Sequence, residues 1–379
     1  MSDQQFIRIL IAPLDWGLGH ATRCIPIIKF FLRCNCTIII ASEGQSYHLL
    51  RAEFPTLQFL HLRGYRVRYA NDKRFLLLKI LFQVPKVLQT IIKEHRWLQS
   101  AINEHSIDAV ISDNRFGFWS RLKPSIFITH QLQIKGPNKW IEWVLRKANY
   151  QHINKYKMCW VPDFKDEPNL AGLLSHPGKF PSIPFTYLGP LSRFTKEENI
   201  TIIYDVLFLL SGPEPQRSIL EAIIYRQLKL YAGRALIVRG KPGEADKPKD
   251  FNQVTVINHL PGRELGEAIQ ASNFIVSRAG YTTIMDMIKL EKKCIFIPTP
   301  GQTEQEYLAN HLHQQNISIA IEQQNFNLGQ ALQAASIFPY QLPTYNMDGY
   351  QQVILQWLHQ LTNEKQNQTN VSPSLQGVS

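Results

Sequence analysis

The sequence predicts an α/β protein made of two Rossmann-like domains whose parallel sheets face each other across a cleft. Short apolar, β-branched runs alternate with stretches of helical length in both halves of the chain. Such alternation is typical of parallel sheets that helices cover on both faces. The 379 residues suffice for two domains of ordinary size, and a hydrophobic content of 44% suits two globular cores.

The first domain is predicted over residues 1–189. It begins with a buried strand at Phe6–Ala12, a polar loop at Pro13–His20 and a helix from Thr22 to Arg33. Its other strands are predicted at the β-branched or apolar runs Thr37–Ala41, Leu57–Leu62, Ala109–Ser112 and Ser125–Thr129. Residues 161–200 are rich in Pro, Gly and polar side chains, so we place the domain boundary near Gly189.

The second domain is predicted over residues 190–362 and repeats the alternation. Its strands are predicted at the runs Asp205–Leu210, Ala235–Arg239, Val254–Ile257, Phe274–Ser277 and Cys294–Pro298. Residues 363–379 are rich in Asn, Gln and Ser, which predicts a disordered tail.

Residues 277–310 contain the most informative pattern of the chain, because polar side chains follow two successive predicted strands. Gly280 permits a tight turn and close backbone approach before a helix. The first N–H groups of that helix and its positive dipole end attract phosphate. In open parallel sheets, ligands bind at the carboxyl ends of the strands, so we expect a phosphate-bearing ligand here.

The pattern Arg278-Ala279-Gly280, followed by Thr283 and Asp286, resembles the donor-nucleotide segment of glycosyltransferase family 28. The best-known member of that family adds GlcNAc to a peptidoglycan lipid precursor. The resemblance implies the GT-B fold, in which a C-terminal helix, here near residues 350–361, crosses back onto the first domain. It also implies that Asp286 binds the ribose hydroxyls of uridine, although the family prefers Glu there. The alternative is a capping-box acid partnered with Thr283.

The resemblance extends to two further loops of the second domain. Gln305 matches the Gln of a His-Gln pair near the donor sugar, while Glu304 replaces the His. Gly212 matches a glycine-rich loop that approaches the diphosphate. The donor-binding residues that we infer are Gly212, Arg217, Arg278, Gly280, Thr282, Asp286, Gln302, Glu304 and Gln305. For Arg278, a structural ion pair is the alternative to a phosphate contact.

The loop Asp15-Trp16-Gly17-Leu18-Gly19-His20 follows the first predicted strand and resembles the family's glycine-rich acceptor loop. Asp15, Gly17 and Gly19 are its candidate acceptor-loop residues. His20 is the candidate catalytic base, because a neutral imidazole can accept the acceptor's hydroxyl proton. The alternative for His20 is a helix cap or a group that only positions the ligand. The loop lacks the third glycine of a dinucleotide fingerprint, which argues against a nicotinamide enzyme.

Positive charge is concentrated in the first half of the chain. Residues 1–190 hold 25 Lys and Arg against 13 Asp and Glu, whereas residues 191–379 hold 16 against 17. Basic and apolar residues are mixed over residues 61–100, which suits an anionic membrane surface. The alternative is a solvated helix whose apolar side packs on its own sheet. Nucleic-acid binding has little support, because no sequence signature of a nucleic-acid-binding module accompanies the positive charge.

The remaining features indicate a cytoplasmic protein that is peripheral on the inner face of the plasma membrane. The amino terminus lacks the apolar core of a signal peptide, and no run approaches 18 apolar residues. The five cysteines are scattered, which favours reduced thiols. No D-x-D acid pair is present in the second domain, so we expect neither a metal nor a cofactor, only a UDP-sugar co-substrate.

These observations together predict a hexosyltransferase. It would move a sugar, GlcNAc or a related hexose, from a UDP-sugar to a hydroxyl acceptor that is lipid-linked or part of a cell-surface glycan. A UDP-sugar 2-epimerase of the same fold is the alternative, although Asp15 and Asp113 offer no clear carboxylate pair for it. A non-enzymatic protein that binds an anionic ligand is the third interpretation.

Overall fold

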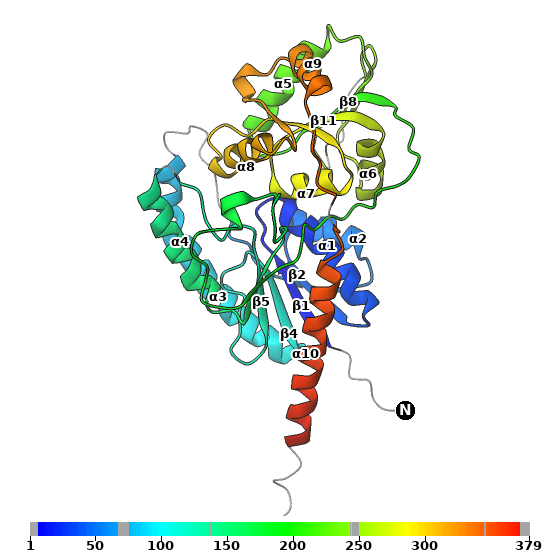
Figure 1. The fold of residues 1–379 in the computed structure, drawn as a ribbon. Coiled ribbons are helices and arrows are strands. Elements are labelled where there is room, and N and C mark those ends of the chain that lie inside the picture. Colours follow the sequence, from blue (N-terminus) through cyan, green and yellow to red (C-terminus); the bar gives the residue numbers. More distant parts are fainter. Residues whose placement is uncertain are drawn as a thin grey trace, which may run out of the picture.

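The computed structural model consists of two α/β domains, one above the other, with a long C-terminal helix along the first (Figure 1). It describes residues 7–66, 76–136, 138–242, 244, 250–344 and 346–371, with the side chains of 76–82 and 367–371 excepted. The sequence-based prediction of an α/β protein with two parallel sheets is confirmed.

The first domain is built on a seven-stranded sheet in the order β3-β2-β1-β4-β5-β6-β7. All its neighbouring strands pair in parallel. The strands are β1 (Arg8–Pro13), β2 (Thr37–Ser42), β3 (Gln58–His61), β4 (Ala109–Asp113), β5 (Ser125–Ile128), β6 (Met158–Val161) and β7 (Phe185–Tyr187). The central residues of β1, β2, β4, β5 and β6 are almost fully buried, as expected for a sheet covered on both faces, whereas the edge strands β3 and β7 are half-buried.

The second domain contains a six-stranded parallel sheet in the order β10-β9-β8-β11-β12-β13. The strands are β8 (Tyr204–Leu209), β9 (Ala235–Val238), β10 (Val254–Ile257), β11 (Ser272–Ser277), β12 (Lys293–Phe296) and β13 (Ile319–Ala320). In both sheets the strand order reverses beside the first strand of the domain. That switch point is where doubly wound sheets bind ligands.

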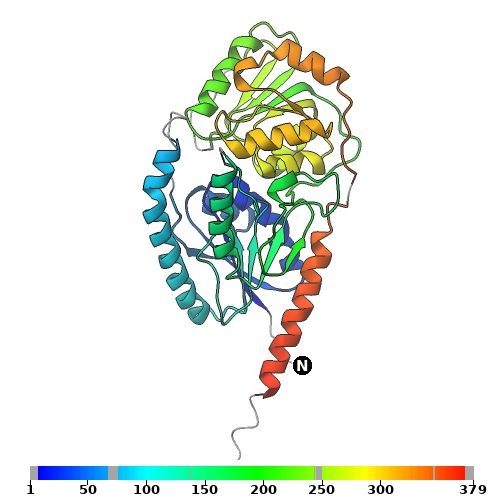
Figure 2. The same cartoon turned by 60° about the vertical axis from the view of Figure 1, so that its left-hand side comes forward.

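Helices connect the strands and cover the sheets (Figures 1 and 2). The first domain contributes α1 (Leu18–Arg33), α2 (Gly44–Glu53), α3 (Leu76–Glu104), α4 (Lys139–Ile153) and the 3-10 turn Gly172–Leu174. The second contributes α5 (Gln216–Leu228), α6 (Gly262–Gln270), α7 (Tyr281–Lys289), α8 (Thr303–Gln314), the 3-10 turn Gln323–Asn325 and α9 (Leu328–Ile337). No described helix is long and apolar enough to span a bilayer.

The last helix, α10 (Tyr350–Val371), follows the second domain but packs on the first. Tyr350 contacts the ring of Phe30, and Trp357 lies edge-on to Phe31 and Trp160. This confirms the expected crossing of the C-terminal helix. The helix continues to Val371, so the predicted disorder is wrong for residues 363–371, where Lys365 pairs with Asp108. Residues 372–379 lie outside the described residues.

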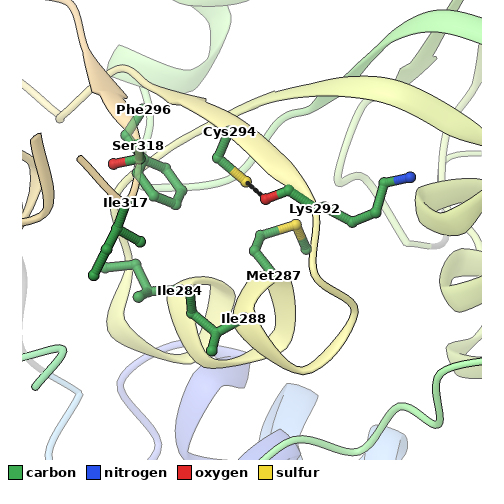
Figure 3. Close-up of a pocket in the computed structure, with 8 residues that line it drawn as sticks. All are labelled: Ile284, Met287, Ile288, Lys292, Cys294, Phe296, Ile317 and Ser318. Carbon is green, nitrogen blue, oxygen red and sulfur yellow. Dashed lines mark hydrogen bonds between the residues drawn. The ribbon is translucent and has the colours of Figure 1, made fainter. Parts of the chain in front are cut away.

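A small apolar cavity lies inside the second domain, between α7 and β12 (Figure 3). Ile284 and Met287 of α7 line it together with Cys294 and Phe296 of β12. Cys294 Sγ lies 3.4 Å from the carbonyl oxygen of Lys292. None of the predicted site residues is among the residues that line this cavity, so it belongs to the core packing of the domain.

Candidate active site between the two domains

The acceptor loop lies at the carboxyl end of β1, where the chain turns into α1. Gly17 caps α1 with a φ of 75°, a conformation that favours glycine. Asp15 accepts hydrogen bonds from the backbone N–H groups of Tyr65 (3.0 Å) and Arg66 (3.3 Å). Asp15 therefore holds the segment after β3 beside the loop.

His20 pairs with Asp113, the last residue of β4. Their Nδ1 and Oδ1 atoms are 2.9 Å apart, and Asp113 is fully buried. Arg23 Nε lies 2.5 Å from Asp113 Oδ2, and Arg23 Nη2 donates to Oδ1. Burial opposes ionisation of Asp113, but Arg23 and His20 outweigh it and hold the pKa at about 2. Asp113 is therefore a carboxylate throughout the physiological pH range.

The imidazole of His20 is arranged as a neutral base. Burial lowers its pKa below 6.5, and Arg23 adds to this while Asp113 opposes it. Nδ1 lies 2.9 Å from Asp113 Oδ1, which can only accept, and 2.9 Å from Arg23 Nη2, which can only donate. Because Arg23 already donates to both oxygens of Asp113, we assign the Nδ1 proton to the bond with Asp113. Nε2 is then the free, basic nitrogen, and no hydrogen bond to it occurs within the described chain. Nε2 can take a proton from a hydroxyl placed in the cleft.

A second histidine, which the sequence did not single out, joins the two domains. His130 follows β5, and its Nε2 lies 2.8 Å from Oε1 of Glu304 in α8. Arg23 Nη1 lies 3.2 Å from His130 Nδ1, so the donor to Glu304 is Nε2–H. The His130 ring stacks on Tyr281 at 4.1 Å. A polar chain thus runs from the His20–Asp113 pair through Arg23 and His130 to the second domain.

The amino end of α7 faces the acceptor loop directly. Thr282 Oγ1 donates to the carbonyl oxygen of Gly19 at 3.1 Å. A Cβ atom on Gly19 would lie 2.9 Å from that Oγ1, which explains the need for glycine. Gly280 caps α7 without a side-chain hydrogen bond, so the first N–H groups of the helix are available to an anion. The structure therefore brings the predicted acceptor loop and Thr282 together.

Arg278 supplies a buried positive charge near Gly212, at the carboxyl end of β8. Its guanidinium donates to the carbonyl oxygens of Ile297 (3.1 Å), Pro298 and Gln216, and to Oε1 of Gln323. Burial lowers the pKa of Arg278 to about 10, and no described carboxylate pairs with it. The ion pair considered as an alternative is therefore not observed.

Two polar atoms beside Gly212 are buried and have no hydrogen-bond partner in the described structure. They are Arg278 Nε and Thr299 Oγ1. A Cβ atom on Gly212, whose φ is 100°, would lie 3.6 Å from that oxygen. Unsatisfied buried donors at the carboxyl end of a strand are suited to an anionic ligand.

Arg217 is engaged within its own domain. Its guanidinium pairs with Glu214 (2.7 Å) and with Glu221 (2.9 Å), and Glu221 also pairs with Arg239. Two carboxylates already neutralise this side chain, and it is buried. A contact between Arg217 and a phosphate stays a prediction that would require this network to open.

The loop before α8 is held by its own glutamines. Gln302 caps α8, and Gln305 Nε2 donates to Gln302 Oε1 at 2.5 Å. Gln305 Oε1 accepts from the backbone N–H of Thr299 at 2.9 Å. Among the three polar side chains predicted here, Glu304 is the one that contacts the first domain, through His130.

Asp286 lies in the second turn of α7 and points to the segment between the domains. Its Oδ1 accepts from Ser192 Oγ at 2.6 Å, and no bond to Thr283 occurs among the described contacts. Burial raises the pKa of Asp286 to about 6, although Arg193 opposes the shift. The capping-box alternative is therefore not observed, and ribose binding stays a prediction.

This raised pKa predicts how Asp286→Asn changes stability. The carboxyl of Asp286 binds its proton more tightly in the folded than in the unfolded protein. Its contribution to the free energy of unfolding is therefore complete below pH 3.8 and is lost as pH rises through about 6. Since Asn stays neutral and can accept from Ser192, we expect the variant to gain up to about 3 kcal/mol at pH 7.5. Urea unfolding at pH 7.5 and pH 4 measures the change in free energy of unfolding, with the exposed variant Asp348→Asn as control. A variant Asp286→Asn that is less stable than the wild type at pH 7.5 would contradict the prediction.

No group of three or more His, Cys, Asp or Glu side chains that could hold a metal ion occurs among the described residues.

Comparison with known proteins gives a family match in the second half of the chain. Residues 207–338 match the Glycosyltransferase family 28 C-terminal domain. No curated protein sequence matches the chain. The solved structure of the glycosyltransferase SnogD from Streptomyces nogalater is similar with a TM-score of 0.62 and 11% identity, over 94% of this chain and 100% of that one.

Two further solved structures share the arrangement. Acinetobacter baumannii MurG has a TM-score of 0.56 and 14% identity, over 93% of this chain and 99% of its own. The spinosyn rhamnosyltransferase SpnG, complexed with thymidine diphosphate, has a TM-score of 0.59 and 11% identity, over 94% and 96%. The chain therefore has the GT-B fold of glycosyltransferases, and its residues 207–338 resemble the C-terminal domain of family 28.

Proposed function

We propose that this protein is a glycosyltransferase that moves a hexose, GlcNAc or a related sugar, from a UDP-sugar to a hydroxyl acceptor. The observation that carries the proposal is the meeting of two features where the two domains touch. The His20–Asp113 pair lies on the first domain, and the uncapped end of α7 lies on the second, joined by the 3.1 Å bond from Thr282 to Gly19. A base and an anion site are the two elements that transfer from a nucleotide sugar requires.

The proposed reaction is a single displacement at the anomeric carbon. His20 Nε2 accepts the proton of the acceptor hydroxyl while its oxygen forms the new bond to that carbon. The bond from the carbon to the β-phosphate oxygen breaks, and the nucleoside diphosphate leaves with the electron pair. The N–H groups at the start of α7 and the charge of Arg278 stabilise the developing phosphate charge. Independence from a metal is part of this proposal.

Nucleotide titration tests the donor site. We expect UDP to bind more tightly than GDP, TDP or CMP in isothermal titration. If Asp286 binds the ribose hydroxyls, Asp286→Ala weakens UDP at least about tenfold, the usual effect of losing a charged hydrogen bond. Exposed Asp348→Ala serves as the matched control. If none of the four nucleotides bound, the protein would resemble glycosyltransferases in fold alone, and the donor site would be contradicted.

The reaction type is tested separately by incubating the enzyme with UDP-GlcNAc alone and with candidate hydroxyl acceptors. A transferase releases UDP faster when the right acceptor is present. Formation of the 2-epimer of the UDP-sugar without any acceptor would contradict the proposal and favour an epimerase.

We also propose a lipid-linked or cell-surface glycan acceptor, with the protein peripheral on the inner face of the plasma membrane through residues 61–100. Of this segment, residues 67–75 lie outside the described structure, as do the side chains of 76–82. What supports the proposal in the described part is α3, where Val84, Leu88 and Ile92 are exposed at a spacing of four residues.

A further inference from the structure

Arg23 is held from two sides by side chains of the first domain. It is buried and lies about one turn after His20 on α1. Its Nε and Nη2 atoms donate to the two oxygens of Asp113, and its Nη1 atom lies 3.2 Å from Nδ1 of His130. Because a guanidinium group is planar and rigid, contacts at both ends fix the direction of its N–H groups. Asp113 and His130 therefore set the orientation of Arg23 together.

That orientation decides which ring nitrogen of His20 carries the proton. Nδ1 of His20 lies 2.9 Å from Asp113 Oδ1 and also 2.9 Å from Arg23 Nη2. Asp113 can only accept and Arg23 can only donate, so the two neighbours favour opposite tautomers. While Nη2 donates to Asp113, the proton of His20 stays on Nδ1 and Nε2 is free. If Nη2 donated to His20 instead, the proton would reside on Nε2, and that nitrogen could not act as a base.

His130 can accept from Arg23 only while its own proton is on Nε2. The 2.8 Å contact between Nε2 and Oε1 of Glu304 selects this tautomer, because a carboxylate only accepts. Burial alone would raise the pKa of Glu304, but the bond to His130 and the charge of Arg23 lower it. Glu304 is therefore a carboxylate at neutral pH, and Nδ1 of His130 stays available as an acceptor.

Two side chains of the second domain hold the His130 ring. Tyr281, the first residue of α7, stacks on it at 4.1 Å with 8° between the ring planes. Glu304 lies in the first turn of α8, and both helices lie on the side of the second domain that faces the first (Figure 1). Gly280 and Gln305, the chain neighbours of these two residues, are proposed to bind the donor. The position of His130 thus depends on the two segments that the donor would touch.

We propose that His130 and Glu304 are positioning residues for the candidate base. Through Arg23 they keep the proton of His20 on Nδ1 while the two domains are together, so that Nε2 is free to take the proton of the acceptor hydroxyl. The purpose of this arrangement rests on the proposed function, in which His20 is the base. Activation of the acceptor is then tied to the presence of the domain that carries the donor.

Nuclear magnetic resonance of protein labelled with ¹⁵N-histidine tests the proposal, because it distinguishes protonated from unprotonated ring nitrogens. Spectra are recorded at pH 8 without any ligand, and the His20 signals are those that disappear in His20→Gln. In the wild type we expect a protonated Nδ1 and an unprotonated Nε2. His130→Phe keeps a ring that can stack on Tyr281 but offers no acceptor to Arg23. Most of His20 should then carry its proton on Nε2, and Glu304→Ala should shift His20 in the same direction.

Kinetics give a second measurement. In His130→Phe, kcat in the UDP-release assay should fall at least about tenfold, because little of His20 is in the form that can take a proton. The affinity for UDP in isothermal titration should stay at the wild-type value, since this side chain is not among the proposed donor contacts.

His130→Asn is the conservative variant, because its amide oxygen can accept from Arg23 in place of Nδ1. It should restore the wild-type signals of His20. Tyr307→Phe is the matched control on α8, since it removes a different bond between the domains, from the Leu173 N–H to the Tyr307 hydroxyl at 2.8 Å. It should keep the wild-type spectrum and kcat.

Wild-type His20 signals in either His130→Phe or Glu304→Ala overturn the proposal. An equal change in Tyr307→Phe overturns it as well, because the effect would then come from a general loosening of the two domains. Glu304→Ala keeps the test decisive if His130→Phe does not fold, since the Glu304 side chain is 37% exposed. The spectra need no substrate, so a protein that shows these changes but transfers no sugar overturns the proposed function and not the positioning of His20.

Discussion

Replacing His20 with Gln is expected to lower kcat for sugar transfer by about 10²- to 10⁴-fold, the range typical of a lost general base. Gln can still donate to Asp113 but cannot accept a proton from the acceptor. Binding of UDP should be nearly unchanged, because the proposed donor contacts lie on the second domain. Release of UDP in the presence of acceptor measures kcat, and titration measures binding. His61→Gln is the matched control, since His61 is 76% exposed at its side chain and lies outside the cleft.

The same residue sets the pH dependence that we expect. Burial lowers the pKa of His20 below 6.5, so the imidazole is neutral at pH 7 and becomes protonated only in more acidic solution. In the wild type, kcat should therefore stay level between pH 7 and 8 and fall on an acid limb whose midpoint lies below 6.5. In His20→Gln this limb should be absent. An unchanged limb in the variant would assign the proton transfer to another group.

Replacing Glu94 with Gln is expected to destabilise the protein by about 3–5 kcal/mol, the usual effect of leaving a buried charge unpaired. Glu94 and Arg115 are almost fully buried, and Arg115 Nε donates to Glu94. Glu94 Oε2 also accepts from the Tyr65 hydroxyl at 2.7 Å and from the Gly117 N–H at 2.9 Å. A neutral amide removes the charge that compensates Arg115. Equilibrium unfolding in urea measures the change.

Glu53→Gln provides the comparison for this stability effect. Its partner Lys29 lies 2.5 Å away, but both side chains are in contact with solvent. Exposed pairs contribute about 0–1 kcal/mol, so the loss should stay within that range. If Glu94→Gln cost no more than Glu53→Gln, water would have to reach Arg115 in the folded state.

Most of the fold could be predicted because its strands are short runs that hydrophobic patterning identifies. The runs at 37–41 and 254–257 correspond to β2 and β10 within one residue. The strands β6, β7 and β13 were missed for physical reasons. β7 has three residues and lies within a stretch rich in Pro and Gly, and β13 has only two. Such strands form because the neighbouring edge of the sheet needs partners, which is a tertiary effect.

The candidate site was predictable wherever a single loop carried the signal. His20 and Gly19 stand in one short motif, and Thr282 follows the turn at Gly280. Which residues pair with them could not be predicted, because the partners come from separate strands. Asp113 and His130 each follow the end of a strand, and only the order of the sheet brings them to Arg23. A search for polar residues after every predicted strand would have found both.

The bond between His130 and Glu304 is one of the hydrogen bonds that hold the two domains against each other. The 2.8 Å contact acts with those of Tyr281 and Pro162 (2.7 Å) and of Thr282 and Gly19 (3.1 Å). If the proposed nucleotide sugar binds between the domains, we expect its entry to require that these bonds open. Its arrival is then a gated event whose rate depends on how often the closed form opens. The closed form needs little reorganisation once the donor is inside, and the donor can leave only when the same bonds open again. Slow binding and slow release of the donor would therefore go together.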